Sequence, residues 1–140
     1  MALHCTRSLG LLLALAAAST SAHAADGVVV IGHENVKHLD ARTVARIYTG
    51  RVIEVDGVSV TAINANVGNP VREHFLRIYL DQDEDKYTAY WTVRRYIGKG
   101  ASPREFGNTN DIINFVTTTP GAVGYIKESD IRPGLNVLLR

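Results

Sequence analysis

The chain has 140 residues, with 15 Lys and Arg against 14 Asp and Glu, and its one cysteine is Cys5. This length fits one small domain with a modest hydrophobic core, and the balanced charge excludes the strongly basic surface that favours nucleic acid or an anionic membrane. Disulfides, thiol nucleophiles and thiolate metal sites are excluded from everything that follows Cys5.

The first 24 residues have the pattern of a secretory signal peptide. Arg7 precedes a short apolar run, Leu9 to Ala18, and Ala22-His23-Ala24 has the small-x-small pattern of a cleavage site. The apolar run is shorter than the roughly 18 residues that a membrane-spanning helix needs. We therefore expect cleavage near Ala24, a periplasmic or secreted location, and a single domain over residues 25–140.

The next two segments predict a strand and a helix. Residues 27–32 are a continuous apolar, β-branched run, which is typical of a strand buried on both faces. The helix is predicted from Asp40, which can cap its first amides, to Gly50, which suits a left-handed C-terminal position. Its apolar face consists of Val44, Ile47 and Tyr48.

A tight turn and a polar loop come next. Asp56-Gly57 is a tight-turn dipeptide between two β-rich runs, residues 52–55 and 58–63, and this predicts a hairpin or a bent entry into the second strand. The second run leads through Gly68 to a further helix, with Asn69 at the N-cap and Pro70 at the first helical position. The apolar residues of this helix are Val71, Phe75, Ile78 and Tyr79.

The start of this helix is our candidate ligand site. A helix N-terminus offers unpaired backbone N–H groups and the positive end of the helix dipole, so it can bind an anion. The alternative is that, like most helix starts, it holds only water. The predicted site consists of Asn66, Gly68, Asn69, the amides of Val71 and Arg72, and the Arg72 side chain as a fixed charge.

The second half of the chain contains two further helices and two strands. The acidic residues 81–85 lack the spacing of a calcium loop, and we expect them to begin an aromatic helix over residues 84–97 and to complement its dipole. The glycine-rich residues 98–103 do not match a phosphate-binding P-loop and are expected to be a flexible connector. The last helix begins near Asn108 and ends at Pro120-Gly121, and residues 122–126 and 136–140 are predicted strands.

Strands that alternate with helices predict an α/β fold, with a mixed, mostly parallel sheet flanked by helices. Ligands of such sheets bind outside the carboxyl ends of the strands, where the loop of residues 64–69 is expected. No enzyme is predicted, because Ser59, Ser102 and Ser129 have no nucleophile-elbow context. No cofactor or metal site is expected either, since His33 and His38 have no third ligand nearby.

Four segments, in this order, resemble the short secreted relatives of the phosphate-binding protein of ABC-type phosphate importers. They are residues 45–51, residues 69–75, Tyr90-Trp91 followed by residues 98–100, and residues 119–126. The most specific piece is Pro-Gly-Ala-Val-Gly-Tyr at residues 120–125. The resemblance implies a type 2 periplasmic-binding-protein-like fold, a role in binding phosphate or a related oxyanion for an importer, and the importer permease as a partner.

The sequence departs from this family in two respects. Full-length members have two lobes, whereas residues 25–140 are expected to form one. Their Arg-Ser-Asp-Gly-Ser-Gly-Thr segment is also missing, since Ala65 and Val67 stand at its Arg and Asp positions when Gly68 is aligned with its first Gly. We therefore expect a single-lobe periplasmic solute-binding-like protein. The alternative is a periplasmic interaction module that kept the fold without the ligand site and docks a partner or forms a homo-oligomer.

Overall fold

A five-stranded mixed sheet forms the centre of the computed structural model, which describes residues 27–140. The strand order is β5-β4-β6-β1-β7, and β4 runs parallel to both of its neighbours. Because β1 is antiparallel to β6 and to β7, four of the five strands share one direction, and the predicted α/β class is confirmed. The strands are β1 (Val28–Gly32), β4 (Thr61–Ala65), β5 (Arg104–Phe106), β6 (Ala122–Lys127) and β7 (Asn136–Leu139).

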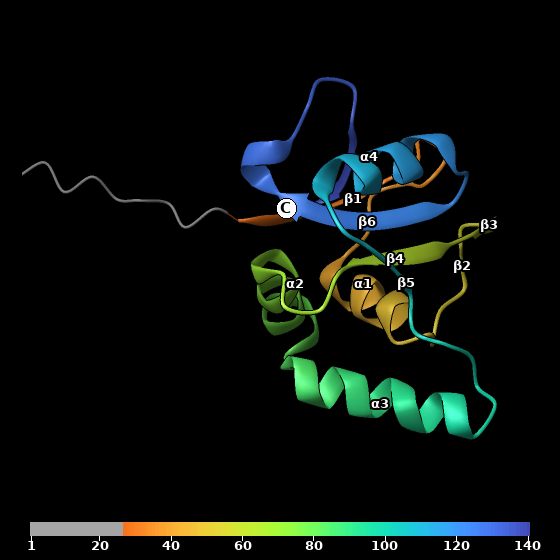
Figure 1. Ribbon diagram of the computed structural model, residues 1–140. Coiled ribbons are helices and arrows are strands. Elements are labelled where there is room, and N and C mark those ends of the chain that lie inside the picture. The colour runs from red at the N-terminus through yellow and green to blue at the C-terminus, as the bar shows by residue number, and fades with distance from the viewer. Residues whose placement is uncertain (1–26) are drawn as a thin grey trace, which may run out of the picture.

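Helices cover both faces of the sheet (Figure 1). Helix α4 lies on one face, α1 and α2 lie on the other, and α3 is the outermost element on that second side. Among residues 27–140, none of these helices has the length and apolar composition that a membrane crossing requires. The helices are α1 (Ala41–Tyr48), α2 (Pro70–Phe75), which continues as the π-helix η1 (Leu76–Leu80), α3 (Glu84–Tyr96), α4 (Thr109–Thr118) and the 3₁₀ turn η2 (Glu128–Asp130). The predicted signal peptide, residues 1–24, lies outside the described residues.

The core on the α1 and α2 side is aromatic. The Phe75 ring stacks on the Tyr125 ring with centroids 3.9 Å apart, and the Tyr48 ring lies 4.6 Å from Phe75. The Tyr48 hydroxyl donates to the carbonyl oxygen of Ile63 at 2.9 Å, so this buried polar group is satisfied. On the opposite face, Gly124 lets α4 approach β6 closely, because a Cβ there would lie 3.2 Å from Ile112.

The predicted helix starts are confirmed by side-chain caps. Each capping oxygen accepts a hydrogen bond from an amide in the first turn of its helix, which satisfies one of the otherwise unpaired donors. The first turn of α3 also carries the predicted acidic residues Glu84 and Asp85. The caps are Asp40 for α1, Asn69 for α2, Asp83 for α3 and Asn108 for α4.

The predicted turn at Asp56-Gly57 is also confirmed. It joins β2 (Glu54–Val55) to β3 (Val58–Ser59), and both turn residues are left-handed, with φ of 48° and 80°. Positive φ at both central positions is what a tight two-residue hairpin requires. The predicted run of residues 58–63 therefore forms two short strands, β3 and the first part of β4.

Two features differ from the predictions. The helix that begins at Pro70 changes to π-helical bonding at Leu76, which lengthens the turn and rotates later residues. As a result Ile78, predicted on the apolar face, is exposed. Arg72 lies before this change, and it is buried because Glu84 and Glu105 hold its side chain. The second difference is β5, a three-residue strand that follows the glycine-rich connector and pairs in parallel with β4.

Candidate functional site

The loop of residues 66–69 lies at the carboxyl end of β4, as predicted. It is held at both ends, since the Asn66 amide donates to the carbonyl oxygen of Phe106 and the Asn69 amide donates to that of Asn66, both at 3.1 Å. Gly68 has a φ of +85°, a conformation that residues with a Cβ adopt at a cost. The structure thus brings the predicted Asn66, Gly68 and Asn69 together in one turn, in which Asn66 and Gly68 are exposed and Asn69 is half-buried.

The backbone donors of this loop differ in availability. The Val71 amide donates to Oδ1 of Asn69 at 2.9 Å, so the helix cap already uses it. Within residues 27–140, the amides of Gly68 and Arg72 have no hydrogen-bond acceptor. Of the two helix amides predicted to bind an anion, the Arg72 amide is therefore the one that the helix cap does not use.

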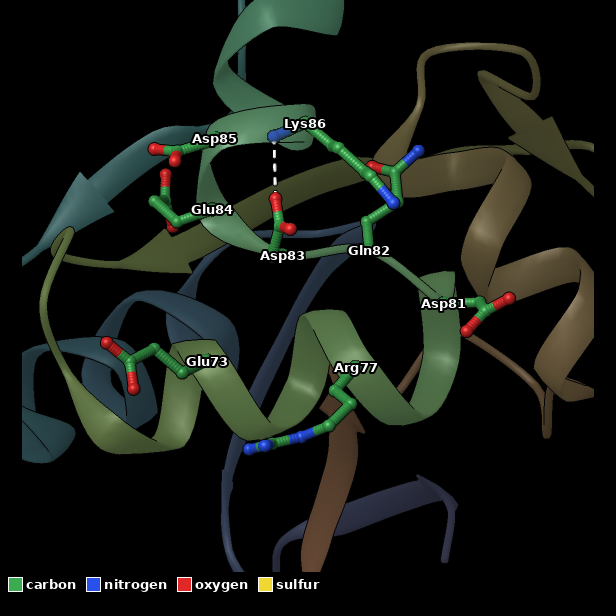
Figure 2. Close-up of a pocket in the computed structure, with 8 residues that line it drawn as sticks. All are labelled: Glu73, Arg77, Asp81, Gln82, Asp83, Glu84, Asp85 and Lys86. Atoms are coloured by element: carbon green, nitrogen blue, oxygen red, sulfur yellow. Dashed lines mark hydrogen bonds between the residues drawn. The ribbon is translucent and has the colours of Figure 1, made fainter.

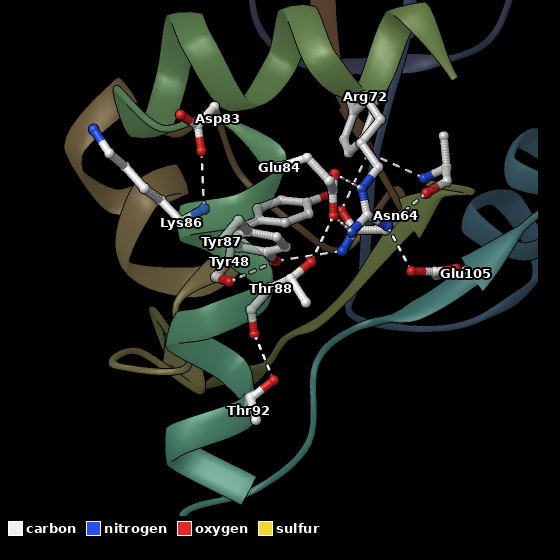
Figure 3. A network of polar contacts seen from close by, with 12 residues as sticks. Tyr48, Asn64, Arg72, Asp83, Glu84, Lys86, Tyr87, Thr88, Thr92 and Glu105 are labelled. Atoms are coloured by element: carbon white, nitrogen blue, oxygen red, sulfur yellow. Dashed lines mark hydrogen bonds and ion pairs between the residues drawn. The ribbon is translucent and has the colours of Figure 1, made fainter. Parts of the chain in front are cut away.

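The Arg72 side chain is held inside the protein and is only 3% exposed. Its Nε donates to Oε2 of Glu84 at 2.8 Å and its Nη2 to Oε1 of Glu84 at 2.6 Å, which is a two-point contact with one carboxylate. Nη1 donates to the carbonyl oxygen of Ala65 at 2.9 Å and to Oε1 of Glu105 at 2.6 Å (Figure 3). The structure therefore directs this predicted charge to two carboxylates of the same chain, Glu84, which is half-buried, and Glu105, which is exposed.

The electrostatics follow from this geometry. Burial by itself would lower the pKa of Arg72, but the hydrogen bonds that the guanidinium donates to Glu84 and Glu105 outweigh it and the pKa is raised. The guanidinium therefore stays charged, and the two carboxylates outnumber it. Binding of an anion beside this cluster gains little from the Arg72 charge, and the backbone amides become the main donors of the loop.

A second polar network lies under the loop and was not predicted. Asn64 is fully buried at the end of β4 and joins two tyrosines: its Nδ2 donates to the Tyr87 hydroxyl at 3.3 Å, and its Oδ1 accepts from the Tyr125 hydroxyl at 3.1 Å. The Tyr125 hydroxyl also accepts from the Ala65 amide at 3.0 Å. This network fixes the last residues of β4, from which the loop starts. The sequence signal for it is an asparagine at the end of an apolar strand.

A cavity of about 220 Å³ adjoins the loop between α3 and the segment before β5. Val67 and Arg72 contribute to its wall beside the loop, and Thr88 and Arg95 contribute from α3. Arg95 is exposed, so the cavity combines apolar side chains, hydroxyl groups and charges of both signs. Its size suits a small ligand.

A larger cavity of about 520 Å³ lies between the helical segment of α2 and η1 and the start of α3 (Figure 2). It is lined mainly by carboxylates, together with Arg77 and Lys86. Despite these acids, the described residues contain no group of three or more His, Cys, Asp or Glu side chains arranged to hold a metal ion.

The fold is shared with solved substrate-binding proteins of phosphate transporters. No protein-family model matches the sequence, and no curated protein is similar to it in sequence. A structure described as a phosphate ABC transporter substrate-binding protein with bound phosphate, from Clostridium perfringens, has a TM-score of 0.64 and 19% identity, and the match covers 81% of this chain and 44% of that one.

Two further structures agree. PstS from Borrelia burgdorferi has a TM-score of 0.60 at 15% identity, and an ABC-type phosphate transport receptor from Vibrio cholerae has a TM-score of 0.56 at 12% identity. Each match covers 81% of this chain, but only 47% and 45% of those chains. The chain therefore has the fold of phosphate ABC transporter substrate-binding proteins over somewhat less than half of their length, which confirms at the level of fold the resemblance seen in the sequence.

Proposed function

We propose that the chain is a periplasmic solute-binding-like protein that binds a small oxyanion, phosphate or a close relative of it, for an ABC-type importer. The observation that carries this proposal is the fold, which is shared with three solved proteins of phosphate transport. The site lies at the loop of residues 66–69, outside the carboxyl end of β4, where ligands of open α/β sheets bind. The importer permease is the proposed partner.

The oxyanion is bound mainly by uncharged donors. The amides of Gly68 and Arg72 have no other hydrogen-bond acceptor in residues 27–140, and Asn66 and Asn69 belong to the same loop. The Val71 amide is shared with the cap, and the Arg72 guanidinium holds the end of β4 from inside. Since no unpaired charge belongs to this set, we expect binding in the millimolar range, about 4 kcal/mol.

Titration with anions, followed residue by residue by NMR, tests the site. Phosphate, arsenate and sulfate are added at constant ionic strength, with chloride as the reference, and the expected result is a saturable shift of the amide signals of Gly68 and Arg72. Gly68→Ala should weaken this binding. Gly98→Ala is the matched control, because Gly98 also has a positive φ and open space around its Cβ position but lies at the far end of α3. Shifts that do not saturate, or equal binding by both variants, would contradict the proposal.

Location is tested separately. Cleavage near Ala24 predicts an exported chain that begins at Ala25, and the intact mass of the protein recovered from the periplasm measures this directly. A cell-associated protein that keeps Met1 would contradict export.

A second candidate is the interaction module that keeps the fold without the ligand. The observation in its favour is the neutralisation of Arg72 by Glu84 and Glu105, which leaves the loop without a net positive charge. Native mass spectrometry separates the two candidates. A stable protein complex that is unaffected by phosphate, together with the absence of saturable anion binding, supports the interaction module.

A further inference from the structure

The outer face of α3 is uncovered. Asp85, Ala89, Thr92 and Tyr96 recur at helical spacing along this face, and all four are exposed. Tyr87 and Trp91, on the opposite face, are buried against the rest of the protein. Figure 1 shows α3 as the outermost helix of its side, so nothing in the described part of the chain covers the stripe.

The two ends of α3 carry opposite charge. Acidic residues gather at its start, whereas residues 86–104 contain five basic residues and no acidic one. Arg95 and Lys99 are exposed, and neither has a carboxylate within ion-pair distance in residues 27–140. The acidic end borders the 520 Å³ cavity of Figure 2, where Oε1 of Gln82 is buried without a hydrogen-bond donor.

Large apolar side chains are exposed at the basic end. Tyr96 is 89% exposed and Val93 is 59% exposed, and Ile97 follows directly after the helix. Exposed apolar groups beside charged ones are typical of a surface that binds another protein. Toward the middle of the helix the stripe narrows to Ala89 and Thr92, which are small enough for a second helix to approach closely.

We propose that α3 is a homodimer interface, in which it packs antiparallel against α3 of a second copy of this chain. The helix has 13 residues and is about 20 Å long, so an antiparallel copy centred between Ala89 and Thr92 sets each basic end against an acidic end. Arg95 and Lys99 then lie beside Asp81 and Asp85 of the other copy. The complementary charges lie on α3 and on the residues just before and after it, so one patch can bind a second copy of itself, as a two-fold interface requires.

This inference does not depend on the proposed function, because it concerns contacts between two copies of the chain. Thr92 and Arg95 also line the 220 Å³ cavity beside the loop of residues 66–69, so the test measures self-association and not anion binding. The test is a charge swap across the interface, measured by sedimentation equilibrium of the purified protein over a range of concentrations. Arg95→Glu and Asp85→Arg should each weaken self-association by at least about tenfold, since each places like charges opposite each other twice in the dimer. An equimolar mixture of the two variants should recover the affinity, because every facing pair is then opposite in charge. High salt should weaken the wild-type dimer.

Lys37→Glu and Glu34→Arg are the matched controls, since they reverse exposed charges far from α3 and should leave self-association unchanged. Circular dichroism checks that every variant is folded. The proposal is overturned by a wild-type protein that stays monomeric at all concentrations, by an Arg95→Glu variant that associates like wild type, or by a mixture that fails to recover. A monomer that instead binds phosphatidylglycerol vesicles in a salt-dependent manner would assign the stripe to a lipid surface and also overturn it.

Discussion

Arg72 makes a bidentate contact with Glu84, in which Nε donates to Oε2 at 2.8 Å and Nη2 donates to Oε1 at 2.6 Å. The two residues stand at the starts of α2 and α3, so this contact sets the position of one helix relative to the other. Nη1 extends the contact to Glu105 on β5. A single buried side chain thus joins two helices, the end of β4 and an edge strand.

Arg72→Ala should destabilise the protein by about 2 kcal/mol, because the half-buried Glu84 and the carbonyl oxygen of Ala65 lose their charged donor. The measurement is the free energy of unfolding from urea denaturation. Arg77→Ala is the matched control on the same helical segment, where the side chain is exposed and makes no ion pair in residues 27–140, and its effect should stay within about 0.5 kcal/mol. A loss below about 1 kcal/mol for Arg72→Ala would contradict a structural role for the cluster.

The contrast between Asn69 and Arg72 shows what the sequence could predict. The cap at Asn69 and the turn at Asp56-Gly57 depend on residues within a few positions of each other, so local chemistry was sufficient. The role of Arg72 depends on partners 12 and 33 residues away, which no local pattern identifies. Its position in the first turn suggested an anion ligand, and only the tertiary structure gives it internal partners.

The other missed features have similar causes. Strand β5 has three residues and gains its structure from pairing with β4, so its sequence carries no clear alternation. The change to π-helical bonding at Leu76 alters which residues face the core, and the helical period used for prediction assumes regular bonding. Strand β1 also lies between β6 and β7, which come from the opposite end of the chain, and no local pattern identifies such distant partners.

Asn64→Ala should destabilise the protein by about 2 kcal/mol, because the Tyr125 hydroxyl loses its acceptor and the Tyr87 hydroxyl loses a donor in a buried place. Asn66→Ala, two residues further on, is the matched control. Its side chain is exposed, and we expect a change of at most about 0.5 kcal/mol in the free energy of unfolding. Equal effects of the two substitutions on urea denaturation would show that the buried network contributes nothing specific.

The stability of the fold should fall at alkaline pH. Burial raises the pKa of Tyr48, Tyr87 and Tyr125 above the ordinary value of a tyrosine. Above about pH 10 the unfolded chain releases these protons while the folded chain retains them. Ionisation therefore stabilises the unfolded state relative to the folded state. The stabilisation is therefore complete below about pH 10 and is lost as the pH rises toward the raised pKa values.

Urea denaturation at a series of pH values from neutral to strongly alkaline measures this loss, with tyrosinate absorbance recorded in parallel. The absorbance of the buried tyrosines should rise together with unfolding. Tyr96→Phe is the control, because the Tyr96 side chain is exposed and its removal should leave the alkaline midpoint unchanged. A free energy of unfolding that stays constant well above pH 10 would refute the linkage.

Gly121 is the glycine at which an added Cβ should be least tolerated. Its φ is +77°, and a Cβ there would lie 1.9 Å from the carbonyl oxygen of Ser59, a backbone atom that cannot turn away. The Gly121 carbonyl also accepts from the Thr61 amide at 2.9 Å, so the two segments cannot separate without losing this bond. Gly121→Ala should therefore cost at least about 3 kcal/mol or prevent folding, by steric overlap added to left-handed strain.

Gly57→Ala separates these two causes. Gly57 has a φ of +80° but nothing within 4 Å of its Cβ position, so alanine there meets only the left-handed strain, about 1 kcal/mol. The comparison uses the yield of soluble protein and, for each variant that folds, the urea midpoint. If the clash with Ser59 decides the outcome, Gly121→Ala is far the more damaging of the two; similar losses would mean that backbone conformation alone accounts for both glycines.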